Sequence, residues 1–145
     1  RSTKIGFVFQ SFHLIPRLTA FENIEMPMIL SGMNPKERSE KVNSALEKVG
    51  LTDRSDHKPE QLSGGQRQRV AIARSIVMEP DVLLADEPTG NLDTTSGKEV
   101  VKLIEELNIA GLTLIVVTHD REMGGRSNRL IQLRDGKIIN DQRKD

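Results

Sequence analysis

A serine–glycine segment and an acidic pair are the residues of this sequence whose types and spacing suit chemistry. The segment Leu62–Gln66 (LSGGQ) runs directly into a stretch with helical periodicity. A helix start that is opened by glycines binds anions, because free backbone N–H groups and the helix dipole both favour a phosphate. The pair Asp86-Glu87 follows an apolar strand, where a phosphoryl-transfer enzyme holds Mg²⁺ and orients water. Together, and in this order, the two motifs indicate ATP chemistry.

The serine–glycine segment has two interpretations. In a phosphate site, Gly64 and Gly65 let backbone amides approach the anion closely, the Ser63 hydroxyl adds a donor, and Gln66 belongs to the same site. The alternative is a plain serine N-cap followed by flexible glycines. Three arginines nearby add positive charge, but a solvated helix face is the favoured interpretation of each one singly: Arg67, Arg69 and Arg74.

The acidic pair lies at the end of a continuous apolar run, residues 82–85. One interpretation is that the strand simply emerges into solvent at this point. In an open α/β sheet, however, ligands bind at the carboxyl ends of the strands. We therefore expect Asp86 to hold Mg²⁺, usually through water, and Glu87 to polarise an attacking water as general base.

A histidine and a glutamine follow two other predicted strands. His119 comes after the apolar strand 113–117, so it should share a crevice with Asp86 and Glu87 and can donate a hydrogen bond to a γ-phosphate. Gln10 ends the first predicted strand, from which its amide oxygen can reach Mg²⁺ or water. His13 and His57 lack such placement and are interpreted as structural.

Asp93 lies in the segment Gly90-Asn91-Leu92-Asp93, which has two uses that are compatible with each other. The segment can be a turn in which Asp93 caps the following helix. The same carboxylate can also face a partner subunit. We keep both interpretations.

The elements that must position these residues alternate along the chain. Period-2 and continuous apolar runs predict strands at 4–9, 82–85 and 113–117, and a hairpin across Asp135-Gly136. Capping residues and 3.6-residue periodicity predict four helices: from Thr19 towards Leu30, from Asn34-Pro35 to Gly50, from Gly64 to about Met78, and through residues 100–107 to Gly111. A further helix at 121–127 is predicted only weakly. Strand–helix alternation predicts a parallel α/β sheet with right-handed crossovers.

The stretch from about Thr19 to Lys48 is predicted to be helical only, which indicates an inserted helical subdomain. We divide the chain into residues 1–10, with a core strand; residues 11–62, with the helical subdomain; and residues 63–145, with the remaining core and a C-terminal hairpin.

Composition narrows the class of protein. The 145 residues carry 21 Lys plus Arg and 21 Asp plus Glu, so no net charge attracts the chain to nucleic acid or to an anionic membrane. The absence of cysteine excludes disulfides and thiolate metal sites. No apolar run approaches the ~20 residues that a membrane-spanning helix needs.

Taken together, these motifs resemble the nucleotide-binding subunit of ATP-binding cassette (ABC) transporters. Gln10 matches the Q-loop, Leu62–Gln66 the signature motif, and residues 82–86 the Walker B strand with Glu87 as catalytic glutamate. Residues 91–93 match the D-loop and His119 the switch histidine. Two stretches, 9–27 and 85–93, look most like the macrolide-export, lipoprotein-release and FtsE-like branch, whose permeases are of the FtsX type.

The resemblance implies a P-loop NTPase-like (RecA-like) core with an inserted α-helical subdomain. It also implies ATP and Mg²⁺ as cofactors and a head-to-tail homodimer, in which ATP lies between the Walker A loop of one subunit and the signature helix of the other. The partners would be membrane permease subunits and no nucleic acid, and the protein would sit peripherally on the cytoplasmic face of the cell membrane.

The chain departs from the family in lacking a Walker A loop, Gly-x4-Gly-Lys-[Ser/Thr]. Its two Gly-Lys pairs, Gly97-Lys98 and Gly136-Lys137, are followed by Glu99 and Ile138 and lack the first glycine. The backbone nest and lysine that hold the β- and γ-phosphates are therefore absent from these 145 residues. We expect the chain to be a C-terminal fragment, with upstream strands and P-loop missing, and to be inactive as an ATPase on its own.

Three other functions stay open at this point. DNA-repair or chromosome-structure ATPases share the motifs but insert long coiled coils, whereas only 20 positions separate Gln66 from Asp86 here. A soluble translation-type ATPase with tandem cassettes is the second alternative. A non-catalytic or regulatory module that pairs with an intact subunit is the third, although the presence of both Glu87 and His119 argues against a decayed site.

Overall fold

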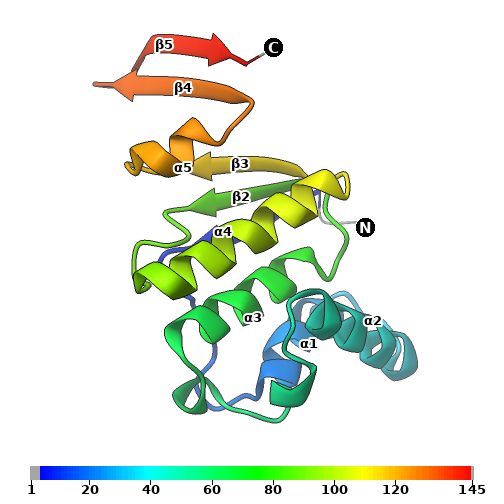
Figure 1. Cartoon of the computed structure of the whole chain (residues 1–145). Helices are drawn as coiled ribbons and strands as arrows, with labels where there is room; N and C mark the ends of the chain where they lie inside the picture. Colours follow the sequence, from blue (N-terminus) through cyan, green and yellow to red (C-terminus); the bar gives the residue numbers. More distant parts are fainter. Residues whose placement is uncertain (1–3, 145) are drawn as a thin grey trace.

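The computed structural model describes residues 4–144, and its centre is a three-stranded parallel sheet. The strands are β1 (Ile5–Phe9), β2 (Val82–Asp86) and β3 (Thr113–Val117), in the order β1-β2-β3. Figure 1 shows this sheet behind α4 (Thr94–Ile109), with α3 (Gly64–Ile76) below it. The three strands predicted from apolar runs are confirmed, and β2 extends one residue further than predicted, to Asp86.

Register brings the carboxyl ends of the three strands level. Phe9 of β1 is paired with Asp86 of β2, which in turn is paired with Val117 of β3. Because parallel strands point the same way, the residue that follows each strand emerges at the same edge of the sheet. The sheet thus places Gln10, Glu87 and the segment at Thr118 side by side.

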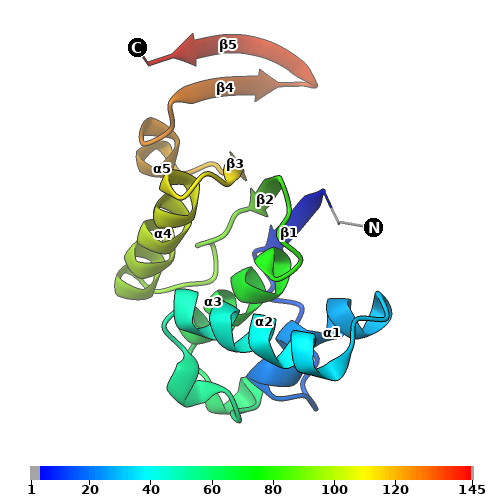
Figure 2. The same ribbon diagram turned by 90° about the vertical axis from the view of Figure 1, so that its right-hand side faces the viewer.

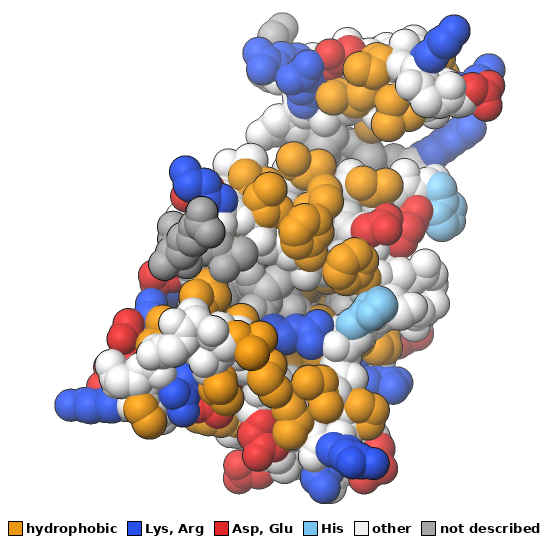
Figure 3. All heavy atoms as spheres, turned by 180° about the vertical axis from the view of Figure 1, so that it is seen from behind, with side chains coloured by type: hydrophobic (Ala, Val, Ile, Leu, Met, Phe, Trp, Pro, Cys, Tyr) orange, Lys and Arg blue, Asp and Glu red, His pale blue; other side chains and the backbone are white. Residues whose placement is uncertain are grey.

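The two faces of this sheet differ. The face towards α3 and α4 is buried, with Val8, Leu83 and Ala85 each at most 2% exposed. The other face carries apolar side chains that remain about half exposed, as the space-filling view from behind shows (Figure 3): Ile5, Phe7, Phe9, Ile115 and Val117. We call these five residues the open sheet face.

Capping residues set where the helices begin. Thr19 and Glu22 form a capping box at the start of α1 (Ala20–Leu30), and Asn34 caps α2 (Pro35–Lys48), which has proline in its first turn. Asp93 caps α4, as predicted, by accepting the Ser96 N–H. The predicted helix starts are therefore confirmed, while α3 ends at Ile76, two residues before the predicted Met78.

A helical layer lies at one end of the sheet, where α1 and α2 pack against α3 (Figure 2). Its core is apolar and closed, and the fully buried residues include Ile24, Met28, Val42 and Leu46. The segment 51–62 contains two single 3₁₀ turns, Thr52–Arg54 and Pro59–Gln61. No helix within residues 4–144 is both long and apolar enough to cross a membrane.

The C-terminal region follows the predicted pattern. The weak helix predicted at 121–127 is a short one, α5 (Arg121–Gly125), capped by Asp120. The predicted hairpin consists of β4 (Arg129–Arg134) and β5 (Lys137–Arg143), which form a separate two-stranded sheet. Its turn residues Asp135 and Gly136 have φ of +51° and +74°, as tight hairpin turns with two left-handed residues require.

We expect Leu83→Ala to lower the free energy of unfolding of the purified chain by about 2–5 kcal/mol, because a fully buried leucine of the central strand leaves a cavity. Urea titration followed by circular dichroism measures this change. The matched control is Leu30→Ala, since Leu30 is 81% exposed, and its effect should stay within about 0.5 kcal/mol. Equal losses for the two variants would contradict the described core.

Candidate active site

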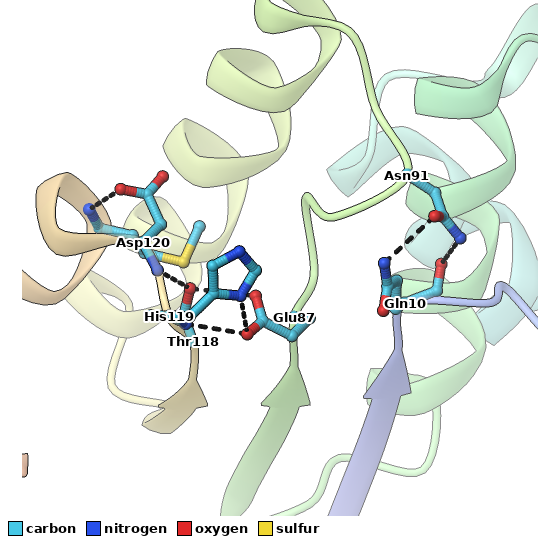
Figure 4. A network of polar contacts seen from close by, with 7 residues as sticks. Gln10, Glu87, Asn91, Thr118, His119 and Asp120 are labelled. Carbon is cyan, nitrogen blue, oxygen red and sulfur yellow. Dashed lines mark hydrogen bonds and ion pairs between the residues drawn. The ribbon is translucent and has the colours of Figure 1, made fainter.

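The side chains that follow the three parallel strands gather at the carboxyl edge of the sheet (Figure 4). Gln10 follows β1, Glu87 follows β2, and Thr118 with His119 follow β3. The expectation that Glu87 and His119 lie together is met by the geometry, because their side chains touch. Gln10 lies at the same edge but bonds to a different residue, Asn91.

The Glu87 carboxylate is held by hydrogen bonds from the end of β3. Its Oε1 accepts the His119 backbone N–H at 2.8 Å and lies 2.6 Å from His119 Nδ1. Its Oε2 accepts the Thr118 hydroxyl at 3.2 Å. A carboxylate oxygen at that distance from Nδ1 requires the proton on Nδ1, which leaves Nε2 of this highly exposed ring to face solvent as the second functional nitrogen.

The backbone of Glu87 is strained. Its φ is +45°, in the left-handed region that a side-chain-bearing residue seldom adopts, and the next residue, Pro88, disfavours helical conformations before it further. The Glu87 N–H donates to the carbonyl of Val117 at 2.8 Å, and the Glu87 carbonyl accepts the Gly90 N–H at 3.0 Å. Strain of this kind persists where surrounding bonds over-determine it, which is common at functional sites.

Hydrogen bonding sets the charge state of Glu87. Partial burial acts to raise the pKa of the carboxyl, but the bonds from His119 and Thr118 outweigh it and hold the pKa below its usual range. Glu87 is therefore ionised at neutral pH. A carboxylate with a lowered pKa is a weaker general base than a free one, so release from His119 would strengthen it as a proton acceptor.

Gln10 and Asn91 bind each other. Gln10 Nε2 donates to Asn91 Oδ1 at 3.1 Å, and Asn91 Nδ2 donates to the Gln10 carbonyl at 3.1 Å. The Gln10 side chain also lies close over Gly90, where a Cβ atom would come within 2.6 Å of its Nε2. Gly90 is thus needed for this close approach. Gln10 Oε1 accepts no hydrogen bond from the residues that the structure describes.

Asp86 and Gln10 were the predicted Mg²⁺ ligands, and their chemistry fits that ion. Asp86 is exposed at the end of β2 and Gln10 Oε1 is free of bonds within residues 4–144, so each offers an oxygen at the same edge. Mg²⁺ commonly takes one or two protein oxygens and completes its shell with phosphate and water. Within the described residues there is no group of three or more His, Asp or Glu side chains that holds a metal by itself.

The serine–glycine segment opens α3 as a capping box. Ser63 Oγ accepts the Gln66 N–H at 3.2 Å and Gln66 Oε1 accepts the Ser63 N–H at 2.9 Å. Gly65 packs against α4, since a Cβ there would lie 2.9 Å from Ser96 Cβ. The N-cap interpretation is therefore confirmed locally, and at least one glycine serves helix packing.

Asp93 lies close to this segment, because Leu92 packs on Gly64 and Ser96 packs on Gly65. The Asp93 carboxylate caps α4, and hydrogen bonds from Ser96 lower the pKa of that exposed carboxyl. The starts of α3 and α4 thus form one surface. The hydrogen bonds of Ser63 stay within the start of α3, and those of the Glu87 side chain go to Thr118 and His119 after β3. Among residues 4–144, no hydrogen bond therefore links Ser63 to the Glu87 side chain.

The arginines of α3 do not form the solvated face that was the favoured interpretation. Arg74 is partly buried and donates to the carbonyls of His13 at 2.7 Å and Phe12 at 3.1 Å, and its burial lowers the pKa of the guanidinium. The Arg67 guanidinium lies 5.1 Å from the centre of the Phe12 ring. That interpretation was wrong for Arg67 and Arg74 because both bind the loop after Gln10.

Arg69 is also partly buried, and reaches the Val49 carbonyl at 3.4 Å and Glu99 at 3.7 Å. His13 is not near Glu87, but it has a left-handed φ of +51° and is held by Arg74. Gln68 is fully buried and was not predicted from the sequence as part of the site. Its position three residues after Gly65 and four before Ile72 puts it on the buried face of α3, which was a usable signal.

Comparison with known proteins matches this arrangement to one family. Residues 1–90 match the family model described as "ABC transporter". The lipoprotein-releasing system ATP-binding protein LolD of Syntrophus aciditrophicus is 52% identical over 140 residues, which are 96% of this chain and 63% of that protein. The macrolide export ATP-binding/permease protein MacB of Rhodopseudomonas palustris is 49% identical over 142 residues, which are 98% and 22% of the two chains.

A solved structure agrees in fold. The ATP-binding cassette MJ0796, in a dimeric post-hydrolysis state bound to ADP and Pi, superposes with a TM-score of 0.83 at 44% identity and covers 99% of this chain and 64% of that one. The chain belongs to the ABC transporter family, and the predicted P-loop NTPase-like α/β fold is confirmed. The predicted branch is supported by relatives for macrolide export and lipoprotein release. The chain spans 63% of the length of LolD.

We expect His119→Ala to raise the pKa of Glu87 towards its usual range, because the side-chain hydrogen bond and the nearby positive charge are both lost. Carbon-13 NMR titration of glutamate carboxyls measures this shift. The folded-state pKa is depressed, so the stabilisation is present above the unfolded glutamate pKa of about 4.3 and is lost as pH falls through the folded value.

The variant should therefore lose less stability than the wild type on acidification below that pH. His57→Ala is the matched control and should leave the Glu87 titration unchanged, because His57 lies in the helical region and makes no bond to Glu87. An unaltered Glu87 titration in His119→Ala would show that the Nδ1 contact does not exist in solution.

Proposed function

We propose that this chain is part of an ATP-hydrolysing subunit of a membrane transporter. The observation that carries the proposal is the Glu87 carboxylate, bonded to both His119 and Thr118 where two parallel strands end level. An ionised carboxylate beside an exposed imidazole, at the ligand-binding edge of an α/β sheet, suits in-line attack of water on a phosphate.

Each side chain has a part in that reaction. Glu87 orients and polarises the attacking water. His119, in a form that carries a proton on Nε2, donates from that nitrogen to the γ-phosphate and steadies the negative charge of the transition state. Asp86 and Gln10 hold Mg²⁺ through oxygen. When bound, Mg²⁺ supplies charge neutralisation on the phosphates.

In the present conformation these groups bind each other. Glu87 is bonded to His119 and Gln10 to Asn91, so nucleotide and water would have to replace both contacts. The lowered pKa of Glu87 has the same implication, because the carboxylate becomes a better base only after leaving His119.

A head-to-tail pair of subunits would complete the site. The N-terminus of α3, with Ser63 to Gln66, shares no hydrogen bond with Glu87 in its own chain among the described residues, which suits a phosphate contact supplied to the other subunit. Asp93, exposed beside it, would face that subunit too. The dimeric state of the cassette MJ0796, bound to ADP and Pi, supports this assembly.

We expect Glu87→Gln to abolish steady-state ATP hydrolysis by the full-length protein, with a fall in kcat of at least about 100-fold and with nucleotide binding retained. A coupled phosphate-release assay measures turnover, and fluorescent-nucleotide titration measures binding. Glu79→Gln is the matched control, because Glu79 is an exposed acid that pairs with Lys41 in the helical region.

The 145-residue chain by itself should show negligible turnover, since it has no Walker A loop. Turnover by that chain alone would contradict the assignment.

The permease partner has a suitable surface. An apolar groove of about 310 Å³ lies between β1, α1 and α3, and it adjoins the open sheet face (Figure 3). A short amphipathic helix of a membrane subunit would fit an apolar groove of this kind. The groove is beside the helical subdomain that we place at residues 11–62, and docking there would hold the protein at the cytoplasmic face of the membrane. Its apolar lining includes Phe7, Met26, Pro27, Leu30 and Met78.

We expect Met26→Asp to reduce capture of the permease by tagged full-length protein from membranes of the source cells, because a charge would enter the apolar groove. Mass spectrometry of the captured proteins provides the measurement. Leu133→Asp is the matched control, since Leu133 lies on the distant hairpin and is 69% exposed. Capture of ribosomal or DNA-repair proteins in place of a permease would favour the alternative ATPase classes.

A further inference from the structure

We infer that Gln68 is a positioning residue that fixes Gln10 and Glu87 relative to each other and to the start of α3. The inference rests on the proposed function, because its catalytic meaning depends on the roles given to Gln10 and Glu87. Its geometric content is independent of those roles. Gln68 itself is buried and reaches neither nucleotide nor water at the carboxyl edge.

The bonds of the Gln68 amide are specific. Its side chain is completely buried, and Nε2 donates to the Phe9 carbonyl at 3.2 Å and to the Pro88 carbonyl at 2.6 Å. Phe9 immediately precedes Gln10, and Pro88 immediately follows Glu87. A primary amide carries two N–H donors on one nitrogen, so a single side chain joins the ends of β1 and β2.

Packing energy alone does not account for a glutamine here. Gln68 Oε1 is buried and has no hydrogen-bond partner among residues 4–144. An unpaired buried acceptor is costly, and an apolar side chain of similar size would avoid that cost. What an apolar side chain cannot supply is the pair of donors directed at the two carbonyls, so the amide is explained by the bonds it makes to them.

The bond to Pro88 also acts on the strained residue before it. Glu87 has a φ of +45°, and in this backbone conformation its carboxylate contacts His119. The turn is held by the Glu87 N–H bond to Val117, the Gly90 N–H bond to Glu87, the carboxylate contacts with the residues after β3, and the Gln68 bond to Pro88. Only the last one comes from α3, which is the helix opened by Ser63.

The same helix therefore connects three parts of the site. Its first residues form the serine–glycine segment, its second turn holds the residues beside Gln10 and Glu87 through Gln68, and its later turn binds the loop after Gln10 through Arg74. A displacement of α3 would move Gln10 and Glu87 together rather than one at a time. The Gln68 amide thus sets the spacing between Gln10 and Glu87.

The test uses Gln68→Asn in the full-length protein, because Asn keeps the amide but is one methylene too short to reach both carbonyls. We expect kcat for ATP to fall roughly 10- to 100-fold, since a displacement of about 1 Å at reacting groups has that effect. The KM for ATP should stay within about twofold, because Gln68 does not touch nucleotide. Ile72→Val is the matched control, one turn further along α3 and equally buried, and it should leave kcat within about twofold.

Hydrogen–deuterium exchange gives a reading that does not depend on hydrolysis. Peptides covering residues 9–15 and 86–92 should both exchange faster in Gln68→Asn and should be unchanged in Ile72→Val. Unaltered exchange in both peptides, or a kcat no lower than that of the control, overturns the inference. If the wild-type protein shows no ATPase activity at all, the proposed function fails, and the exchange result still decides the positioning role.

A measurement on the wild type covers the case in which Gln68→Asn does not fold. NMR couplings across hydrogen bonds should connect Gln68 Nε2 with the carbonyl carbons of Phe9 and Pro88. Detection of both couplings supports the inference. Absence of both, with the Gln68 side-chain amide well resolved, overturns it.

Discussion

The level register of three parallel strands is the constraint on which the rest of this molecule depends. Ladder pairing of Phe9, Asp86 and Val117 fixes where each strand ends, and the residue after each end is then committed to one edge. Hydrogen bonds then hold the candidate site residues at this edge. Glu87 is bonded to the His119 backbone just after β3, and Gln10 is bonded to Asn91 in the turn after β2. A slip of one residue in β2 would turn its buried leucine, Leu83, to the open face and draw Glu87 into the strand.

Much of this arrangement could be predicted from the sequence because the signals are local. Thr19, Asn34 and Asp93 cap helices through their own side chains, and the short apolar run 82–85 favours a buried strand. The contact between Glu87 and His119 was also predictable, since the carboxyl ends of parallel strands lie at the same edge of the sheet. These inferences needed only periodicity, capping chemistry and one topological rule.

What could not be predicted depends on contacts between distant residues. Arg67 and Arg74 looked like a charged helix face, yet both turn towards the loop after Gln10, and that choice is made by the packing of α3 on β1. Gln68 looked like one of several polar residues after the glycines. Only the fold shows that its amide meets two carbonyls, of Phe9 and Pro88, that lie far apart in the sequence. The left-handed conformation of Glu87 likewise has no signature in a Glu-Pro dipeptide.

The open sheet face has a thermal consequence. Because Ile5, Phe7, Phe9, Ile115 and Val117 are still about half hydrated when the chain is folded, unfolding adds less new apolar hydration than it would for a sheet covered on both sides. The heat capacity increment of unfolding is correspondingly small, and the curve of stability against temperature is shallow. Any surface that covers this face on association would reveal itself calorimetrically, by a negative heat capacity change.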